Sequence, residues 1–243
     1  MDAYRGDLAY IHDAGYGDLA RDAAKRLIEE LTSTGHRAGT VVDLGCGSGI
    51  LAAAASDAGY HVVGIDAAEA MVALARTRVP KADFRVGSFV SADLPRCVAV
   101  AAVGEVLNYL FDPANDDRAR ANLFRRVHDA LVPGGVLLVD VAGPQRARPG
   151  GPRRTFATAL DWAVLVETSF EPASGVLTRD IVTFRRTGDF YRRDEERHRL
   201  VLLDPDAVLR ALRSAGFEAH MIPSYGTLPL PPGVVGFVGR RRS

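Results

Sequence analysis

The stretch that most constrains this chain of 243 residues runs from Val41 to Leu51 and reads VVDLGCGSGIL. A short apolar run that contains one acid, Asp43, leads into three alternate glycines, Gly45, Gly47 and Gly49, and small residues follow. This order indicates a buried strand, a tight turn and the start of a helix. Because glycine has no Cβ and tolerates positive φ, the turn offers a ligand a bare backbone.

A second strand, read from HVVGID, follows about twenty residues later and ends in Asp66 directly before another helix. An acid at that place accepts hydrogen bonds from both hydroxyls of a ribose. The dinucleotide fingerprint needs a third glycine or an alanine where this chain has Ile50. Asp43 would also repel a pyrophosphate. Two acids at one edge of a sheet therefore favour a nucleoside that carries no phosphate.

These motifs resemble those of the class I S-adenosylmethionine (SAM) dependent methyltransferases, whose ligand carries an ammonium and a sulfonium group. The resemblance extends to YIHDAGYG near the N-terminus, the triplet N-Y-L at 108–110 and L-x-P-G-G before an apolar strand. It covers roughly residues 4–138 and the final helix and hairpin. A dinucleotide-binding variant remains the alternative for the cofactor.

The resemblance implies a SAM site and suggests residues for the chemistry. The cofactor is expected to contact Tyr10, Asp43, Gly45, Cys46, Gly47, Gly49, Asp66, Ala67, Met71, Gly87, Ser88, Phe89 and Glu105. Many family members carry Asp where this chain has Ser88, so Phe89 and the main chain are expected to share the adenine contact. Candidates for a proton acceptor are His12, Glu105 and His198, needed only if the accepting atom starts protonated. The substrate is expected to meet Asn108, Tyr109, Arg192 and Tyr225, and no metal site is expected.

The hydrophobic pattern predicts a single α/β domain with a Rossmann-like, seven-stranded, mostly parallel sheet. Residues 1–36 form an N-terminal lid and a helix, residues 37–143 the SAM-binding core, and residues 204–243 a last helix and hairpin. The apolar run 97–103 reads as a strand buried on both faces. A helix is expected to begin at Asp112, which is followed by Pro113. The aromatic residues and the histidine of the lid cover a ligand or pack the segment onto the domain.

An antiparallel insertion is expected after the fifth strand. A loop rich in Pro, Gly and Arg runs from 144 to 154, and three strands alternate within residues 155–203. Since the parallel sheet is expected to hold the cofactor, the insertion is where substrate choice should reside.

The predicted function is N- or O-methylation of a small metabolite or natural-product intermediate, with in-line transfer that depends on proximity. The alternatives are a SAM-binding protein without transferase activity and a protein methyltransferase. A net charge of zero argues against nucleic acid as a partner, and no apolar run is long enough for a membrane span. Two cysteines without a C-x-x-C pair favour the cytoplasm, and heavy Ala and Arg usage suggests a bacterial source. A monomer and a homodimer are both compatible with the sequence.

Overall fold

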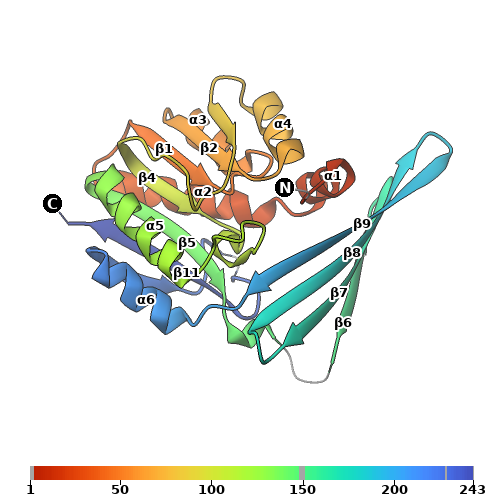
Figure 1. Cartoon of the computed structure of the whole chain (residues 1–243). Helices are drawn as coiled ribbons and strands as arrows, with labels where there is room; N and C mark the ends of the chain where they lie inside the picture. The colour runs from red at the N-terminus through yellow and green to blue at the C-terminus, as the bar shows by residue number, and fades with distance from the viewer. Residues whose placement is uncertain (1–2, 148–150, 228, 243) are drawn as a thin grey trace.

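A twisted seven-stranded sheet, with helices on both of its faces, forms the body of the computed structural model (Figure 1), which describes residues 3–147, 151–227 and 229–242. The sheet has the order β10-β11-β5-β4-β1-β2-β3, and a second sheet has the order β6-β7-β8-β9. The elements are α1 (Gly6–Gly15), α2 (Asp18–Ser33), β1 (Thr40–Leu44), α3 (Ile50–Asp57), β2 (His61–Asp66), α4 (Glu69–Arg78), β3 (Asp83–Val86), β4 (Cys97–Ala102), η1 (Val106–Asn108), α5 (Asp117–Ala130), β5 (Leu131–Ala142), η2 (Pro144–Arg146), β6 (Arg153–Thr158), β7 (Trp162–Glu171), β8 (Val176–Thr187), β9 (Phe190–Val201), α6 (Pro205–Ser214), β10 (Phe217–Ile222) and β11 (Val234–Arg241).

Strands β1 to β5 are parallel, and β11 runs antiparallel between β5 and β10. Parallel neighbours need crossover connections, and a helix supplies the crossovers from β1 to β2, from β2 to β3 and from β4 to β5. The predicted α/β class, with a mostly parallel sheet of seven strands and an antiparallel insertion, is confirmed.

The central strands are buried on both faces because successive side chains point to opposite sides. Val41 packs into a core with α2, α3 and α4, whereas its neighbour Val42 packs into a second core with α5 and α6. Leu27 of α2 and Leu123 of α5 represent the two helical layers. Burial on both faces leaves the strand ends as the part of the sheet open to a ligand.

The insertion between β5 and α6 contains four strands, and it extends away from the body as a long antiparallel sheet (Figure 1). The expectation of three strands within 155–203 is wrong by one. The additional strand, β6, pairs with β7 from Arg153↔Thr168 to Thr158↔Ala163. Its side chains are mostly exposed and include few apolar residues, so the sequence lacked the alternation that reveals a half-buried strand.

The N-terminal lid forms a helix, α1, that packs between the insertion and the body. Leu8 and Ile11 contact a cluster with Trp162 of β7, while Ala9 packs against Met71 of α4. The aromatic segment therefore both packs onto the domain and lies over its strand ends.

Helix α5 begins at Asp117, one turn later than the expected start at Asp112. The side chain of Asp116 accepts a hydrogen bond from the Ala119 amide and caps the helix. Asp112 makes a similar bond to the Ala114 amide in the preceding turn. Two capping signals thus lie close together, and the helix uses the second one.

Asp204 caps the last helix, α6, since its side chain accepts a hydrogen bond from the Asp206 amide. Within the described ranges, none of the helices combines the length and apolar character that a membrane crossing requires.

Candidate active site

The glycine turn after β1 is shaped by one close approach and one open face. At Gly45, where φ is 68°, an added Cβ would overlap with the side chain of Val106. At Gly47, where φ is 51°, an added Cβ would meet no atom within 4 Å, because this residue faces a cavity. The turn therefore presents unobstructed backbone to a ligand.

Asp66, at the end of β2, connects this turn to the next helix. Its Oδ2 accepts a hydrogen bond from the Gly47 amide and its Oδ1 accepts one from the Ala68 amide, each at 2.8 Å. Burial raises the pKa of this carboxyl, while the backbone N–H donors act to lower it. A carboxylate has about four acceptor sites, so Asp66 retains capacity for ligand hydroxyls.

A cavity opens above the carboxyl ends of β1, β2 and β4, the usual ligand position in an open α/β sheet. Its lining residues are Ala3, Tyr4, His12, Gly45, Gly47, Ile65, Asp66, Ala67, Ala68, Met71, Gly87, Ser88, Phe89, Val103, Gly104, Val106, Tyr109, Phe111 and Asp112. This set includes Gly45, Gly47, Asp66, Ala67, Met71, Gly87, Ser88 and Phe89, which were expected to contact the cofactor. The bare backbone, the carboxylates of Asp66 and Asp112 and the apolar walls fit SAM, which carries ribose hydroxyls, an ammonium group and a sulfonium group.

Three of the other expected cofactor contacts, Asp43, Cys46 and Gly49, are not among the residues that line the cavity. Asp43 is buried, and its Oδ2 has no hydrogen-bond partner within the described part of the chain. Burial and the charge of Asp66 raise the pKa of Asp43 to about 8. Cys46 is buried as well, and Gly49 precedes α3 and packs against Ala75. These residues support the turn.

Tyr10 faces the insertion, so the structure does not bring it to the cofactor cavity. Its hydroxyl donates a hydrogen bond to Asp161 at 2.8 Å, and the guanidinium of Arg185 lies 3.6 Å from its ring centroid. His12, two residues further along α1 and so on the opposite side of the helix, faces the cavity instead.

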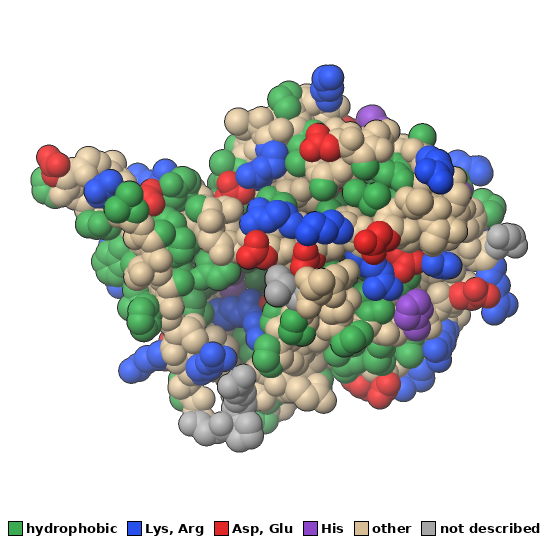
Figure 2. Space-filling view, turned by 180° about the vertical axis from the view of Figure 1, so that it is seen from behind, with side chains coloured by type: hydrophobic (Ala, Val, Ile, Leu, Met, Phe, Trp, Pro, Cys, Tyr) green, Lys and Arg blue, Asp and Glu red, His purple; other side chains and the backbone are tan. Residues whose placement is uncertain are grey.

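A second, larger hollow of about 600 Å³ lies between α1, the inner face of the insertion and the body. It is lined by Tyr4, Leu8, His12, Tyr16, Leu19, Gly104, Glu105, Tyr109, Arg146, Ala147, Gly151, Arg153, Thr155, Val164, Val166, Thr168, Ser169, Phe170, Leu177, Arg179, Ile181, His198, Pro231, Pro232 and Val234. Figure 2 shows it from behind, with basic side chains between the arm of the insertion and the body. Tyr4, His12, Gly104 and Tyr109 line both spaces, so the cavity and the hollow meet there.

Two tyrosines and His198 form the wall where the two spaces meet. The hydroxyls of Tyr4 and Tyr109 are 2.8 Å apart, and the ring centroid of His198 lies 4.8 Å from that of Tyr4. His198 Nε2 is 2.9 Å from a carboxylate oxygen of Glu196, which also accepts hydrogen bonds from the Tyr4 and Arg5 amides. Glu196 thus joins the start of α1 to the insertion.

The pKa of His12 is lowered to about 4, chiefly by burial, with Asp13 opposing the shift and His198 adding to it. His12 is therefore neutral near pH 7. A general base works best when its pKa lies near the working pH, so His12 is suited to accept a hydrogen bond and poorly suited to hold a proton.

Glu105 lies three residues after the end of β4 and has a left-handed backbone with φ of 63°. Asp140 at the end of β5 holds this conformation by accepting hydrogen bonds from the Gly104 and Glu105 amides. Burial raises the pKa of Asp140 to about 6, partly offset by these donors. The Glu105 side chain points into the hollow, where both of its carboxylate oxygens accept from arginines.

Asn108, Tyr225 and Arg192, expected to meet the substrate, have other partners in the structure. The buried amide of Asn108 donates to the carbonyls of Ala142 and Val201 and accepts from the Ala142 amide. It ties the two ends of the insertion to the body. Tyr225 is buried and donates to Asp140, and the exposed Arg192 pairs with Asp7 of α1. Of the expected substrate contacts, Tyr109 lines the hollow.

Several residues that line the hollow or hold its walls in place were not predicted from the sequence. One is Arg179, which occupies an inward position between Leu177 and Ile181 on β8. A charged residue in the apolar phase of an alternating strand was the available signal. Asp140 offered a similar one, as an acid inside an apolar run. Glu196 gave no comparable signal, because its strand is rich in charge throughout.

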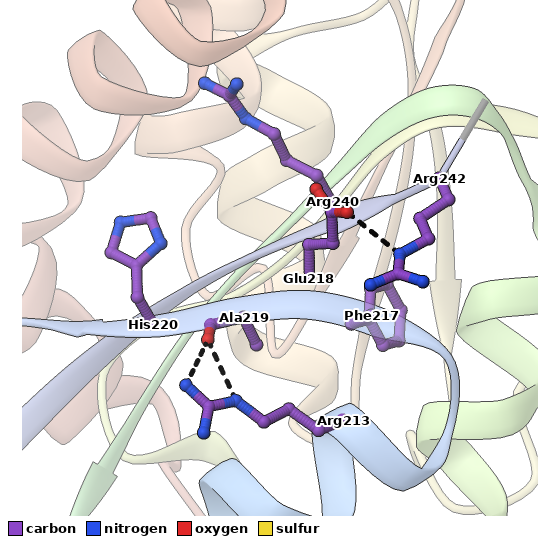
Figure 3. Close-up of a pocket in the computed structure, with 7 residues that line it drawn as sticks. All are labelled: Arg213, Phe217, Glu218, Ala219, His220, Arg240 and Arg242. Carbon is purple, nitrogen blue, oxygen red and sulfur yellow. Dashed lines mark hydrogen bonds and ion pairs between the residues drawn. The ribbon is translucent and has the colours of Figure 1, made fainter.

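A separate groove of about 660 Å³ lies beside β10, which is an edge strand of the main sheet (Figure 3). Its polar side chains are largely paired locally, since Arg213 donates to the Ala219 carbonyl and Arg242 pairs with Glu218. Strands β11, β5 and β4 separate it from β1, so it has no part in the site at the strand ends. Within the described residues, His, Cys, Asp and Glu do not form a cluster of three or more that could hold a metal ion.

Known proteins resemble this chain in both sequence and structure. A family model described as a methyltransferase domain matches residues 41–135. The Bacillus subtilis protein YqeM, a methyltransferase by its name, is 27% identical over 192 residues, which are 76% of this chain and 75% of that protein. An S-adenosylmethionine-dependent methyltransferase from Clostridium acetobutylicum superposes with a TM-score of 0.81 at 16% identity, over 97% of this chain and 98% of its own. The sugar N-methyltransferase KedS8 from a Streptoalloteichus species gives 0.74 at 21% identity, over 98% and 94%. The two solved structures share the fold.

Proposed function

The chain is a class I SAM-dependent methyltransferase, and we propose that it methylates a nitrogen atom of a small molecule bound in the hollow. The observation that carries this proposal is that the cavity and the hollow share four lining residues, which we call the shared wall. Tyr4, His12, Gly104 and Tyr109 line both the cofactor cavity and the hollow. A molecule in the hollow therefore adjoins the cofactor cavity along this wall.

The cofactor supplies a methyl group on a sulfonium, which is an excellent leaving group. The protein's part is mainly to hold the accepting atom in line and to keep water away, because proximity accounts for much of such a rate enhancement. The aromatic wall of Tyr4, Tyr109 and Phe111 serves the second purpose. The Tyr4 and Tyr109 hydroxyls orient the accepting atom through hydrogen bonds.

His198 is the best-placed proton acceptor if the amine arrives as an ammonium. Since the ionised Glu196 only accepts, His198 Nε2 donates to it and Nδ1 is left with a free lone pair. Glu105, the other carboxylate at this site, is held by two arginines, and His12 binds a proton too weakly.

The choice of nitrogen rests on the similarity to KedS8, which is a sugar N-methyltransferase. The choice of a small molecule rests on the size of the hollow, about 600 Å³, which lies in the range of small-molecule pockets and is too small for a folded protein. A SAM-binding protein without transferase activity would not need a second space that adjoins the cofactor cavity.

Methyl-labelled SAM tests the proposal. The full chain is incubated with a metabolite extract of the source cells and, separately, with their protein fraction, using Gly47→Val as the inactive control. We expect the label in a small molecule, on nitrogen, as identified by mass spectrometry. Label in proteins alone, or no transfer despite SAM binding, would support one of the two alternatives.

A further inference from the structure

A cluster of arginines around one carboxylate lies on the hollow's inner surface. Glu105 Oε1 accepts a hydrogen bond from Arg146 Nε at 3.1 Å, and its Oε2 accepts one from Arg179 at 2.6 Å. Arg146 belongs to η2 and Arg179 to β8. The Glu105 side chain is 9% exposed and that of Arg179 is 17% exposed. Two guanidinium groups thus share one carboxylate, which leaves one positive charge without a counter-ion among the described residues.

A third arginine extends this excess of charge. Arg153, on β6, lines the same hollow, and none of the ion pairs or hydrogen bonds found among the described residues involves it. Its neighbour Arg154 points to the outer face and pairs with Glu167. Among the described residues that line the hollow, the charged groups are Glu105 and three arginines, a net charge of about +2.

A structural tie between insertion and body would need only one of the two arginines beside Glu105. A second positive charge in a partly buried place is costly unless an anion compensates it. Both guanidinium groups also keep unused donors. Arg179 uses one nitrogen for Glu105 and one for the Tyr109 hydroxyl, and Arg146 uses Nε for Glu105 and one nitrogen for the Pro232 carbonyl. Neither arginine forms the two-pronged pair with Glu105 that guanidinium groups prefer with oxyanions.

We propose that the substrate carries an oxyanion group, a phosphate or a carboxylate, that binds to Arg146, Arg153 and Arg179. This inference rests on the proposed function and narrows its substrate to an amine that also bears an acidic group. Glu105 directly follows Gly104 of the shared wall. The acidic group therefore lies beside the transfer site, on the side that leads away from the cofactor towards Arg153 at the rim.

Calorimetric titration of non-reacting anions into the full chain, saturated with S-adenosylhomocysteine, tests the oxyanion site. Pyrophosphate and malonate serve as the phosphate and carboxylate probes at low ionic strength. We expect at least one to bind with a dissociation constant in the millimolar range or below, and Arg153→Gln to weaken it at least fivefold. Arg154→Gln is the matched control, with the same charge change on the adjacent, outward-facing residue, and should leave binding unchanged. Equal effects of the two substitutions, or no binding of either anion, would overturn the proposal.

Matched acceptors separate this inference from the proposed function. Methyl transfer is compared for glucosamine 6-phosphate and glucosamine, and for an amino acid and its amide. The inference predicts a KM at least tenfold lower for the acidic member of an accepted pair, an advantage lost in Arg153→Gln. Equal transfer to neutral amines would leave the function standing and remove the inference. Specific anion binding without transfer to any small molecule would support the oxyanion site and contradict the proposed function.

Discussion

The cavity proposed for the cofactor and the hollow proposed for the substrate lie side by side but are built in different ways. The cavity is formed mainly by short segments at the ends of β1, β2 and β4 and the turn after β3, where bare backbone and the carboxylates of Asp66 and Asp112 line the space. The hollow is formed by side chains from α1, the insertion and residues 231–234. Backbone recognition is tied to a fold and changes little, whereas a wall of side chains on an inserted sheet is free to change with the substrate.

Helix α1 connects the two regions. Tyr4 and His12 line both spaces, and the insertion holds the helix through Asp7 with Arg192, Tyr10 with Asp161, and Glu196 with the Tyr4 amide. Damage to the insertion should therefore act on the hollow first and reach the cofactor only through α1.

The substitution with the largest expected effect on one region alone is Gly47→Val, which should act on the cavity. The new side chain would project into the cavity, and the substitution would also place a β-branched residue at positive φ. SAM affinity should therefore fall more than about 100-fold, roughly 3 kcal/mol. Gly188→Val is the control, because Gly188 in the turn of the insertion also has positive φ, 62°, and open space around its Cβ. It should bind SAM like the parent. Calorimetry measures the affinity and circular dichroism the fold; normal affinity in a folded Gly47→Val protein would contradict the account of the cavity.

Asp66→Ala should have the next largest effect. It removes the acceptor for the Gly47 and Ala68 amides and for ligand hydroxyls, and charged hydrogen bonds of this kind are worth about 2–4 kcal/mol together. SAM affinity should fall roughly 30- to 700-fold. Asp57→Ala, at the exposed end of α3, is the matched control. Equal SAM affinities for the two variants would show that Asp66 does not hold the ligand.

The predictability of the two regions differs for a physical reason. Residues of the cavity come from continuous stretches whose glycine spacing and acid positions reflect local backbone needs. The sequence alone therefore singled out Gly45, Gly47 and Asp66, which line the cavity. The hollow depends on partners far apart along the chain, such as Glu105 with Arg179 and Tyr4 with Glu196. No local pattern records such pairs.

Polar residues near the site were the main source of error. Asn108 and Tyr225 lie close to the strand ends, yet they satisfy buried groups of the protein itself, Asn108 at Ala142 and Tyr225 at Asp140. A polar side chain near strand ends can bind a ligand or can satisfy a buried group of the protein. Which of the two it does depends on where the neighbouring strands end. Strand β6 was missed for the related reason that an exposed edge strand needs no apolar alternation.

A smaller effect, visible in the pH dependence of stability, is expected at His12, where the two regions meet. The pKa of His12 is lowered to about 4 in the folded protein from about 6.5. As the pH falls through this window, the unfolded chain binds a proton that the folded protein does not, so stability is lost. His12→Asn should remove this loss. Its free energy of unfolding should therefore fall less than that of the parent between pH 7.5 and 4.5, by on the order of 1–2 kcal/mol. Urea unfolding at both pH values measures this free energy, and His61→Asn, at an exposed position, is the control. An equal fall in the parent and in His12→Asn would refute the assignment of the lowered pKa to His12.

The smallest effect is expected from Asp7→Asn, which weakens the attachment of α1 to the insertion. The buried Asp7 carboxylate pairs with Arg192 and Arg185, and an amide keeps the shape but loses the charge. The substrate KM should rise about three- to tenfold, roughly 1 kcal/mol, and SAM affinity should change less. Asp18→Asn, whose pair with Arg21 is exposed, should alter neither. A larger loss in SAM affinity than in KM would mean that α1 belongs chiefly to the cofactor region.

The claim that the substrate occupies the hollow beside an independent cofactor cavity is tested most directly by filling the hollow. Val166 on β7 lines it, and the adjacent Leu165 is 46% exposed on the outer face. SAM affinity and methyl transfer are measured for Val166→Trp and Leu165→Trp with a substrate identified as above. The account predicts that Val166→Trp keeps SAM affinity within about threefold of the parent and lowers kcat/KM at least 100-fold, while Leu165→Trp leaves both unchanged. Parental turnover by folded Val166→Trp would contradict it.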